Sequence, residues 1–166
     1  MNNFIASDTG LIHFIAGVFS LIFGTTILFL KKGTKLHKQL GYVYTASMIV
    51  LLVTAFMIYR LFDGWAIFHY AALISSITLL IGIIPPIFLR HKKYWVNIHF
   101  NAMYWSVLGL WAAFLAEMSV RIPETTFYWM VGLAFGLTML VGAIVFGIYK
   151  KKWRNEFSNY NRKKNE

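Results

Sequence analysis

Histidines are the residues of this chain that are best suited to chemistry. His13 stands in "LIHFIAG", inside a run with no charged residue, and His69 stands in "IFHYAAL", inside a second such run. A neutral imidazole is a ligand for haem iron, and it also exchanges a proton near physiological pH. We therefore weigh cofactor binding and proton handling against a purely structural role for these side chains.

The histidines also suggest an internal repeat. His37 and His91 are each followed by lysine, in "LHKQL" and "RHKKY"; His37 lies 24 residues after His13, and His91 lies 22 residues after His69. This pattern predicts two tandem helical hairpins related by a pseudo-twofold axis along the membrane normal. His13 and His69 then share one depth and His37 and His91 share another, although His99 lies deeper than His91 and could replace it in the second layer.

The elements that must position these side chains are membrane-spanning helices. Hydrophobic residues make up 58% of the 166 residues and charged residues only 13%, well below the roughly one quarter that is usual in soluble domains. Five charge-free runs have about the 20 residues that a helical span requires, at 9–30, 39–59, 64–89, 94–116 and 125–149. We predict an all-α polytopic membrane protein with five transmembrane helices, four of them forming the two-hairpin bundle.

The basic residues predict the orientation of these spans. Of the 16 lysines and arginines, all but Arg60 and Arg121 fall on one side, in two loops and in the C-terminal tail. The positive-inside rule then places the N-terminus outside the plasma membrane and the C-terminus in the cytoplasm. The same charges attract anionic lipid heads at the cytoplasmic face. No recognition fold accompanies them, so nucleic-acid binding is not expected.

We predict a single transmembrane domain over 1–149 and a basic cytoplasmic tail over 150–166. The tail is expected to be partly helical at the membrane surface, through Trp153 and Phe157. The chain has no cysteine, which excludes disulfides, cysteine-ligated iron–sulfur clusters and covalently attached haem. Histidine-ligated cofactors remain open.

Three spans carry stripes of small residues at helical spacing, and such stripes let helices approach closely. We expect them to face protein rather than lipid. They comprise Gly10, His13, Gly17, Ser20 and Gly24 in the first span, His99, Ala102, Ser106, Gly109 and Ala113 in the fourth, and Gly132, Gly136, Ala143 and Gly147 in the fifth.

Two further features lie near span ends. Glu117 and Arg121 have the i, i+4 spacing of a helical ion pair, with a polar lid that handles protons as the functional alternative. Pro85 and Pro86 lack backbone N–H groups and are expected to bend or end the third span early. The carbonyls released around Ile81 and Gly82 make an ion site the alternative to an early helix end.

The segments "HFIAGVFSLIFGTTILFLKKGTKLHKQLGYVY", "FHYAALISSITLLIG" and "RHKKYWVNIHFNAMYW" resemble an uncharacterised bacterial family of small membrane proteins, the domain-of-unknown-function family 2306. The resemblance covers residues 10–122. It implies that the positions to watch are His13, His37, His69 and His91, with Arg121 following. It implies no activity.

Our leading hypothesis is non-covalent haem b bound by His13 and His69, with a second site from His37 and either His91 or His99. Such a protein passes electrons, for example from a quinol or a reductase partner.

The main alternative is a non-enzymatic membrane protein, a small-solute carrier or an assembly or scaffold partner, whose histidines are structural or sense pH. Zinc is a third hypothesis, which needs a third or fourth ligand; Glu117 is the best candidate near His13 and His69.

Overall fold

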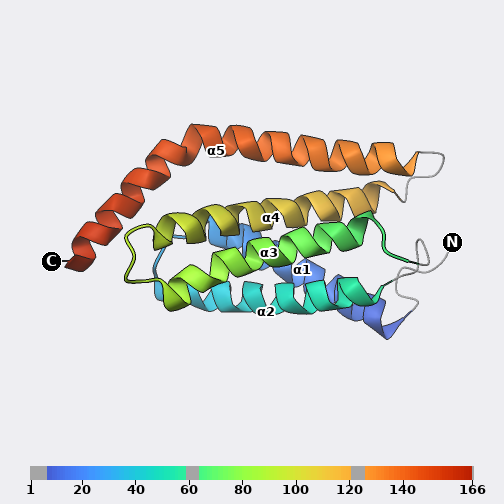
Figure 1. Ribbon diagram of the computed structural model, residues 1–166, viewed down its shortest axis with the longest axis horizontal. Helices are drawn as coiled ribbons and strands as arrows, with labels where there is room; N and C mark the ends of the chain where they lie inside the picture. The colour runs from blue at the N-terminus through green and yellow to red at the C-terminus, as the bar shows by residue number, and fades with distance from the viewer. Residues whose placement is uncertain (1–6, 59–63, 121–125, 166) are drawn as a thin grey trace. The chain divides into compact units, whose positions relative to one another are not determined.

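A computed structural model of the chain describes residues 7–58, 64–120 and 126–165. Over these ranges the secondary structure is helical throughout (Figure 1). The helices are α1 (Asp8–Phe29), α2 (Lys35–Met57), α3 (Ile67–Phe88), α4 (Trp95–Ser119) and α5 (Phe127–Asn165). Each contains a segment long and apolar enough to cross a membrane. The predicted all-α protein with five spans is confirmed.

The helices group into two compact units, Met1–Leu79 and Leu80–Glu166, with the boundary inside α3. The first unit contains α1, α2 and the beginning of α3. The second contains the end of α3, α4 and α5. The pseudo-twofold relation between the two predicted hairpins stays a prediction, because the two units are not placed relative to each other.

The turn between α1 and α2 is built from three polar or flexible residues. Lys32 donates from Nζ to the carbonyls of Ile27 and Leu28, both at 2.8 Å, and so binds the last carbonyls of α1. Gly33 has a φ of 79°, a backbone conformation that glycine adopts without steric strain. Thr34 then caps α2 through its side chain.

In the first unit, α1 packs on α2 along the predicted small-residue stripe. A Cβ at Gly17 would lie 3.5 Å from Leu51 Cδ1, in van der Waals contact. Ser20 is fully buried, and its hydroxyl donates to Ser47 Oγ at 2.9 Å. The expectation that this stripe faces protein is confirmed for α1, since its glycine and serine bring the two helices close together.

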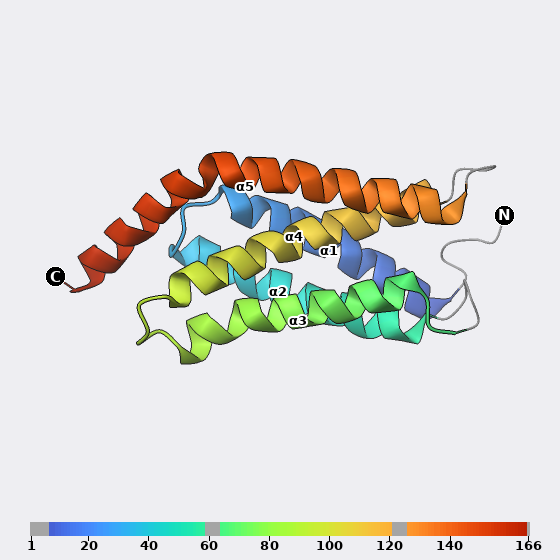
Figure 2. The same ribbon diagram turned by 45° about the horizontal axis from the view of Figure 1, so that its top comes forward.

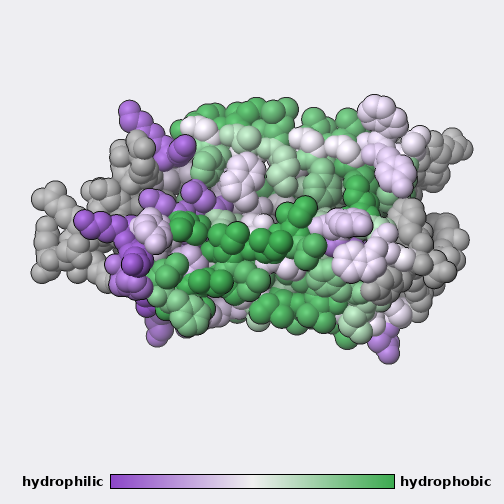
Figure 3. All heavy atoms as spheres, viewed as in Figure 1, coloured by the Kyte–Doolittle hydropathy of each residue, from purple (hydrophilic) through white to green (hydrophobic). Residues whose placement is uncertain are grey.

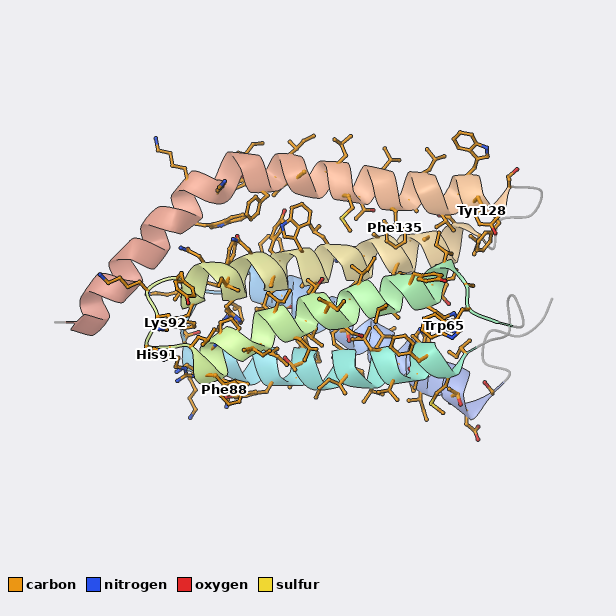
Figure 4. All side chains as sticks on the ribbon, viewed as in Figure 1. Trp65, Phe88, His91, Lys92, Tyr128 and Phe135 are labelled. Carbon is orange, nitrogen blue, oxygen red and sulfur yellow. The ribbon has the colours of Figure 1, made fainter. Side chains whose placement is uncertain are left out.

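In the second unit, α4 packs on α5 (Figure 2). Tyr104 donates its hydroxyl hydrogen to the carbonyl of Gly142 at 2.8 Å, and Leu108 occupies the space that a Cβ at Gly142 would need. Phe135 points from α5 toward α4 (Figure 4). Along the span, α5 is covered by hydrophobic residues, and hydrophilic residues gather at the end where it leaves the span (Figure 3).

The prediction that the small-residue stripe of α5 faces protein is wrong within this unit. Nothing lies within 4 Å of a Cβ placed on Gly132, Gly136 or Gly147, and Ala143 is exposed. The contact with α4 is made through Gly142 and the large residues beside it. Small residues alone do not show which helix face is covered, because a different face of α5 fits Leu108 and Tyr104 better.

The tail continues the fifth span as a helix, since α5 runs to Asn165. Its C-terminal part bends away from the axis of its first part in both ribbon views (Figures 1 and 2). The predicted boundary at residue 149 is therefore not a helix end.

Candidate functional site

His13 is held by a side chain of α2. Its Nδ1 lies 2.9 Å from Thr54 Oγ1. The single hydroxyl hydrogen of Thr54 is directed to its own helix, at 2.8 Å from the Val50 carbonyl and 2.9 Å from the Leu51 carbonyl. If the hydroxyl hydrogen turned to His13, Nδ1 would accept it. With the hydrogen on its own helix, Thr54 Oγ1 accepts and His13 donates from Nδ1–H. In the neutral ring, Nε2 then keeps its lone pair.

His69 has the opposite arrangement at the start of α3. It is 4% exposed, and its Nδ1 accepts the backbone N–H of Ala66 at 3.2 Å. The backbone N–H of His69 in turn donates to the Ala66 carbonyl at 2.9 Å. These bonds resemble a capping box, in which the third helical residue reaches back to the residue before the helix. A ring that accepts at Nδ1 carries its hydrogen on Nε2.

Trp65 covers the ring of His69. The two rings stack with centroids 5.6 Å apart, and Trp65 also contacts Phe56 of α2 at 6.2 Å. Figure 4 shows Trp65 beside the first turn of α3. His69 therefore connects to α2 through an aromatic contact, whereas His13 connects to it through a hydroxyl.

His99 compensates for a proline in the second unit. Pro86 has no N–H, so the Gly82 carbonyl lacks the donor it would have in a regular helix. His99 Nδ1 lies 2.6 Å from that carbonyl and donates to it, which leaves the lone pair on Nε2 of the neutral ring. Met103 of α4 also lies close to this point, since a Cβ at Gly82 would be 2.5 Å from Met103 Sδ and would require that side chain to move.

The expected early end of the third span is wrong. Both Pro85 and Pro86 lie inside α3, which continues to Phe88. The prediction that the Gly82 carbonyl lacks its usual helical donor is confirmed, because residue 86 is a proline inside α3. This carbonyl accepts a hydrogen bond from His99 of the neighbouring helix. The alternative ion site at these carbonyls stays a prediction.

His37 and His91 lie at helix ends in different units. His37 is half-buried in the first turn of α2, and its backbone N–H donates to Thr34 Oγ1 at 3.2 Å. His91 is exposed in the loop between α3 and α4, beside Lys92 (Figure 4). Their pairing in a second site stays a prediction.

The polar pair at the end of α4 is only partly described. Glu117 is half-buried on α4, and Arg121 lies outside the described residues, as does Arg60. The predicted ion pair and the polar lid stay predictions. Within 7–58, 64–120 and 126–165, no three side chains of the kinds that bind zinc come together at one point. The zinc hypothesis therefore gains no support from the described residues.

Trp153 anchors the beginning of the tail to α4. Its ring centroid lies 4.9 Å from that of Phe100, 5.6 Å from that of Tyr104 and 6.0 Å from that of Phe146. The interfacial aromatic residue expected from the sequence is thus packed between two helices of its own unit.

Comparison with known protein families, with curated proteins and with solved structures gives no match. The resemblance to the uncharacterised family stays a prediction. Function is therefore inferred from the histidines and from the atoms they contact.

Proposed function

We propose that this integral membrane protein binds haem b non-covalently through His13 and serves in electron transfer. The observation that carries the proposal is the hydrogen bond from His13 Nδ1 to Thr54 Oγ1. Histidines that ligate metals almost always donate their other ring N–H to an oxygen, which fixes the tautomer and orients the ligating nitrogen. His13 meets this requirement inside an apolar helix pair.

His99 meets the same requirement in the second unit, since its Nδ1 donates to the Gly82 carbonyl. It therefore replaces the exposed His91 as our preferred ligand for a second site. Bound haem would supply an iron that changes its charge by one electron, and a quinol or a reductase is the expected partner.

The apolar seam around His13 would keep water away from such a cofactor. Ala16, one turn from His13, is 6% exposed, and Leu51, which packs against Gly17, is 9% exposed. Low solvent access is one of the means by which a protein sets the potential of a haem. The role of these residues in the proposal is exclusion of solvent, and that of Thr54 is orientation of the ring.

The test is the visible spectrum of the detergent-purified protein, oxidised and reduced, from a host that makes haem. We expect a Soret band in the wild type. The band should be lost or strongly reduced in His13→Ala and retained in His91→Ala, whose ring is in an exposed loop. A wild type without a Soret band, or a band unaffected by His13→Ala, contradicts the proposal.

A second candidate function is favoured by the bond from Ala66 N–H to His69. A histidine that caps a helix is structural, and it accepts this bond only when it is neutral. On this hypothesis the protein is a non-enzymatic carrier or scaffold partner whose histidines hold helices or sense pH. The expected result is then a colourless protein in which His69→Ala lowers thermal stability and His69→Gln, which can still accept the N–H, does not.

A further inference from the structure

We propose that the second unit has a docking surface for anionic phospholipids, and that Trp153 is the residue that positions one of its two segments. We call it the basic surface. It consists of Arg90, Lys92 and Lys93, between α3 and α4, and of Lys150 and Lys151 on α5, all of them exposed. The surface lies entirely within one unit, and the proposal does not depend on haem.

Trp153 fixes the α5 segment of the basic surface beside the beginning of α4. Its ring centroid lies 4.9 Å from that of Phe100 and 5.6 Å from that of Tyr104, both in the first three turns of α4. Tyr149, one turn earlier on α5, stacks on the same indole at 5.6 Å. The two lysines of α5 lie between these aromatic residues in the chain, and the loop directly precedes α4. Both segments are therefore held at the same end of α4.

This end of the second unit carries a large excess of positive charge. The sequence has three basic residues in the loop and seven from Lys150 onward, against two acidic residues there, Glu156 and Glu166. In the first unit, residues 31–38 contain four lysines, of which Lys32 already donates to the end of α1. Like charges held together repel one another, and basic clusters beside a span attract anionic lipids. The second unit is therefore the stronger surface for an anionic partner.

Exposed apolar side chains adjoin both segments of the basic surface. Phe88 at the end of α3 is 70% exposed, and Figure 4 shows it at the same end as Lys92. Ile148 is 68% exposed, and it precedes Lys150 by about 3 Å along the axis of α5.

A phospholipid offers matching groups in the same order. Its acyl chains cover apolar side chains of the span, and its phosphate lies at the level that lysine reaches by extending its stem along apolar surface. A soluble acidic protein or a free phosphate would leave Phe88 and Ile148 uncovered. The chemistry of the surface therefore favours a ligand that is both anionic and apolar.

The experiment titrates the detergent-purified full chain with dioleoylphosphatidylglycerol or dioleoylphosphatidylcholine and measures bound lipid by native mass spectrometry. We expect the wild type to bind phosphatidylglycerol more tightly. Two double variants remove charge from the basic surface, Lys92→Gln with Lys93→Gln and Lys150→Gln with Lys151→Gln. Each should weaken the binding of phosphatidylglycerol by about 5-fold per lysine and leave that of phosphatidylcholine unchanged.

The matched control is Lys35→Gln with Lys38→Gln, which removes two exposed charges from the first turn of α2. It should leave the tightest binding of phosphatidylglycerol unchanged. Equal weakening in the control, or a wild type with no preference for phosphatidylglycerol, overturns the proposed surface. Glycerol phosphate has the head group without acyl chains and should not displace the lipid. Displacement at equal concentration would show a site for a soluble anion and overturn the lipid assignment.

The role of Trp153 is tested with the same titration. Trp153→Ala should weaken the binding of phosphatidylglycerol about as much as loss of the two α5 lysines, whereas Trp153→Phe, which keeps an aromatic ring, should retain it. Phe100→Leu removes the same ring contact from α4 and should act as Trp153→Ala does, so it decides the question if Trp153→Ala does not fold. Lower thermal stability with an unchanged preference for phosphatidylglycerol would show that the contact is structural only and overturn the positioning role.

Discussion

The partner of each imidazole determines which of its nitrogens carries the hydrogen. A hydroxyl that is already donating, a backbone carbonyl and a backbone amide give His13, His99 and His69 their respective tautomers. The sequence identified all three histidines but could not assign their tautomers, because the partners come from other helices or from the residue before a helix. Thr54 in particular was not predicted, since a threonine in a span ordinarily satisfies its hydroxyl on its own helix.

The two lysines that follow α1 also differ in the groups that they contact. Lys32 donates to two terminal carbonyls of α1, whereas Lys31 is exposed. We expect Lys32→Met to lower the free energy of unfolding by about 1 kcal/mol, because it removes charge-assisted bonds at a helix C-terminus. Lys31→Met makes the same change in net charge and should alter it by less than about 0.5 kcal/mol. Denaturant unfolding of the solubilised protein measures both, and equal effects would contradict the distinction.

At the scale of helices, the most informative contacts are those that compensate for a local defect. Pro86 removes the donor for one carbonyl of α3, and His99 of α4 provides another. The missing donor could be predicted from the sequence, since proline has no N–H. The replacement donor, His99, could not be predicted, because its position depends on how α4 is rotated against the end of α3. Spacing gave two candidates in the second layer, His91 and His99, and the structure places only His99 on a helix.

The bond between His99 and Gly82 can be tested with a double-mutant cycle. In the wild type, we expect His99→Ala to lower the free energy of unfolding by about 1–2 kcal/mol, because the Gly82 carbonyl loses its donor. In Pro86→Ala, the new N–H of residue 86 reaches that carbonyl, and the effect of His99→Ala should be clearly smaller.

The matched control for this cycle is Pro85→Ala, whose new N–H serves the Ile81 carbonyl instead. It should leave the effect of His99→Ala unchanged. Additive effects with Pro86→Ala, or equal coupling with both prolines, would show that the bond to Gly82 contributes little.

The contact between α4 and α5 predicts different outcomes for two glycines of α5. Gly142→Val places a side chain where Leu108 lies, so we expect a loss of about 1–3 kcal/mol from overpacking. Gly147→Val, on the open face, should have little effect. Denaturant unfolding compares the two. A larger loss at Gly147 would indicate that the open face is covered by something outside the described chain.

For the whole molecule, the fold class could be predicted because bilayer thickness and the need to satisfy backbone groups leave few alternatives for a charge-free run. The five runs and the five helices agree to within a few residues at most ends. The division into two units could not be predicted, since α3 reads as one uninterrupted apolar segment. The continuation of α5 as one helix beyond Tyr149 could not be predicted either. It is accompanied by the packing of Trp153 against Phe100, and these two residues lie far apart in the sequence.

The orientation of the molecule is still a prediction from charge, and the absence of cysteine makes it directly testable. Thr126 and Lys151 are exposed and stand at the two ends of the spanning part of α5. The basic loops and tail predict that Lys151 is cytoplasmic. A membrane-impermeant maleimide should therefore label Thr126→Cys on intact cells and Lys151→Cys only after the membrane is opened.

Lys35→Cys and Lys92→Cys should behave as Lys151→Cys does, because an odd number of spans separates each of them from Thr126. Labelling of Lys151→Cys on intact cells would reverse the orientation, and different behaviour of Lys35→Cys and Lys92→Cys would contradict the number of spans.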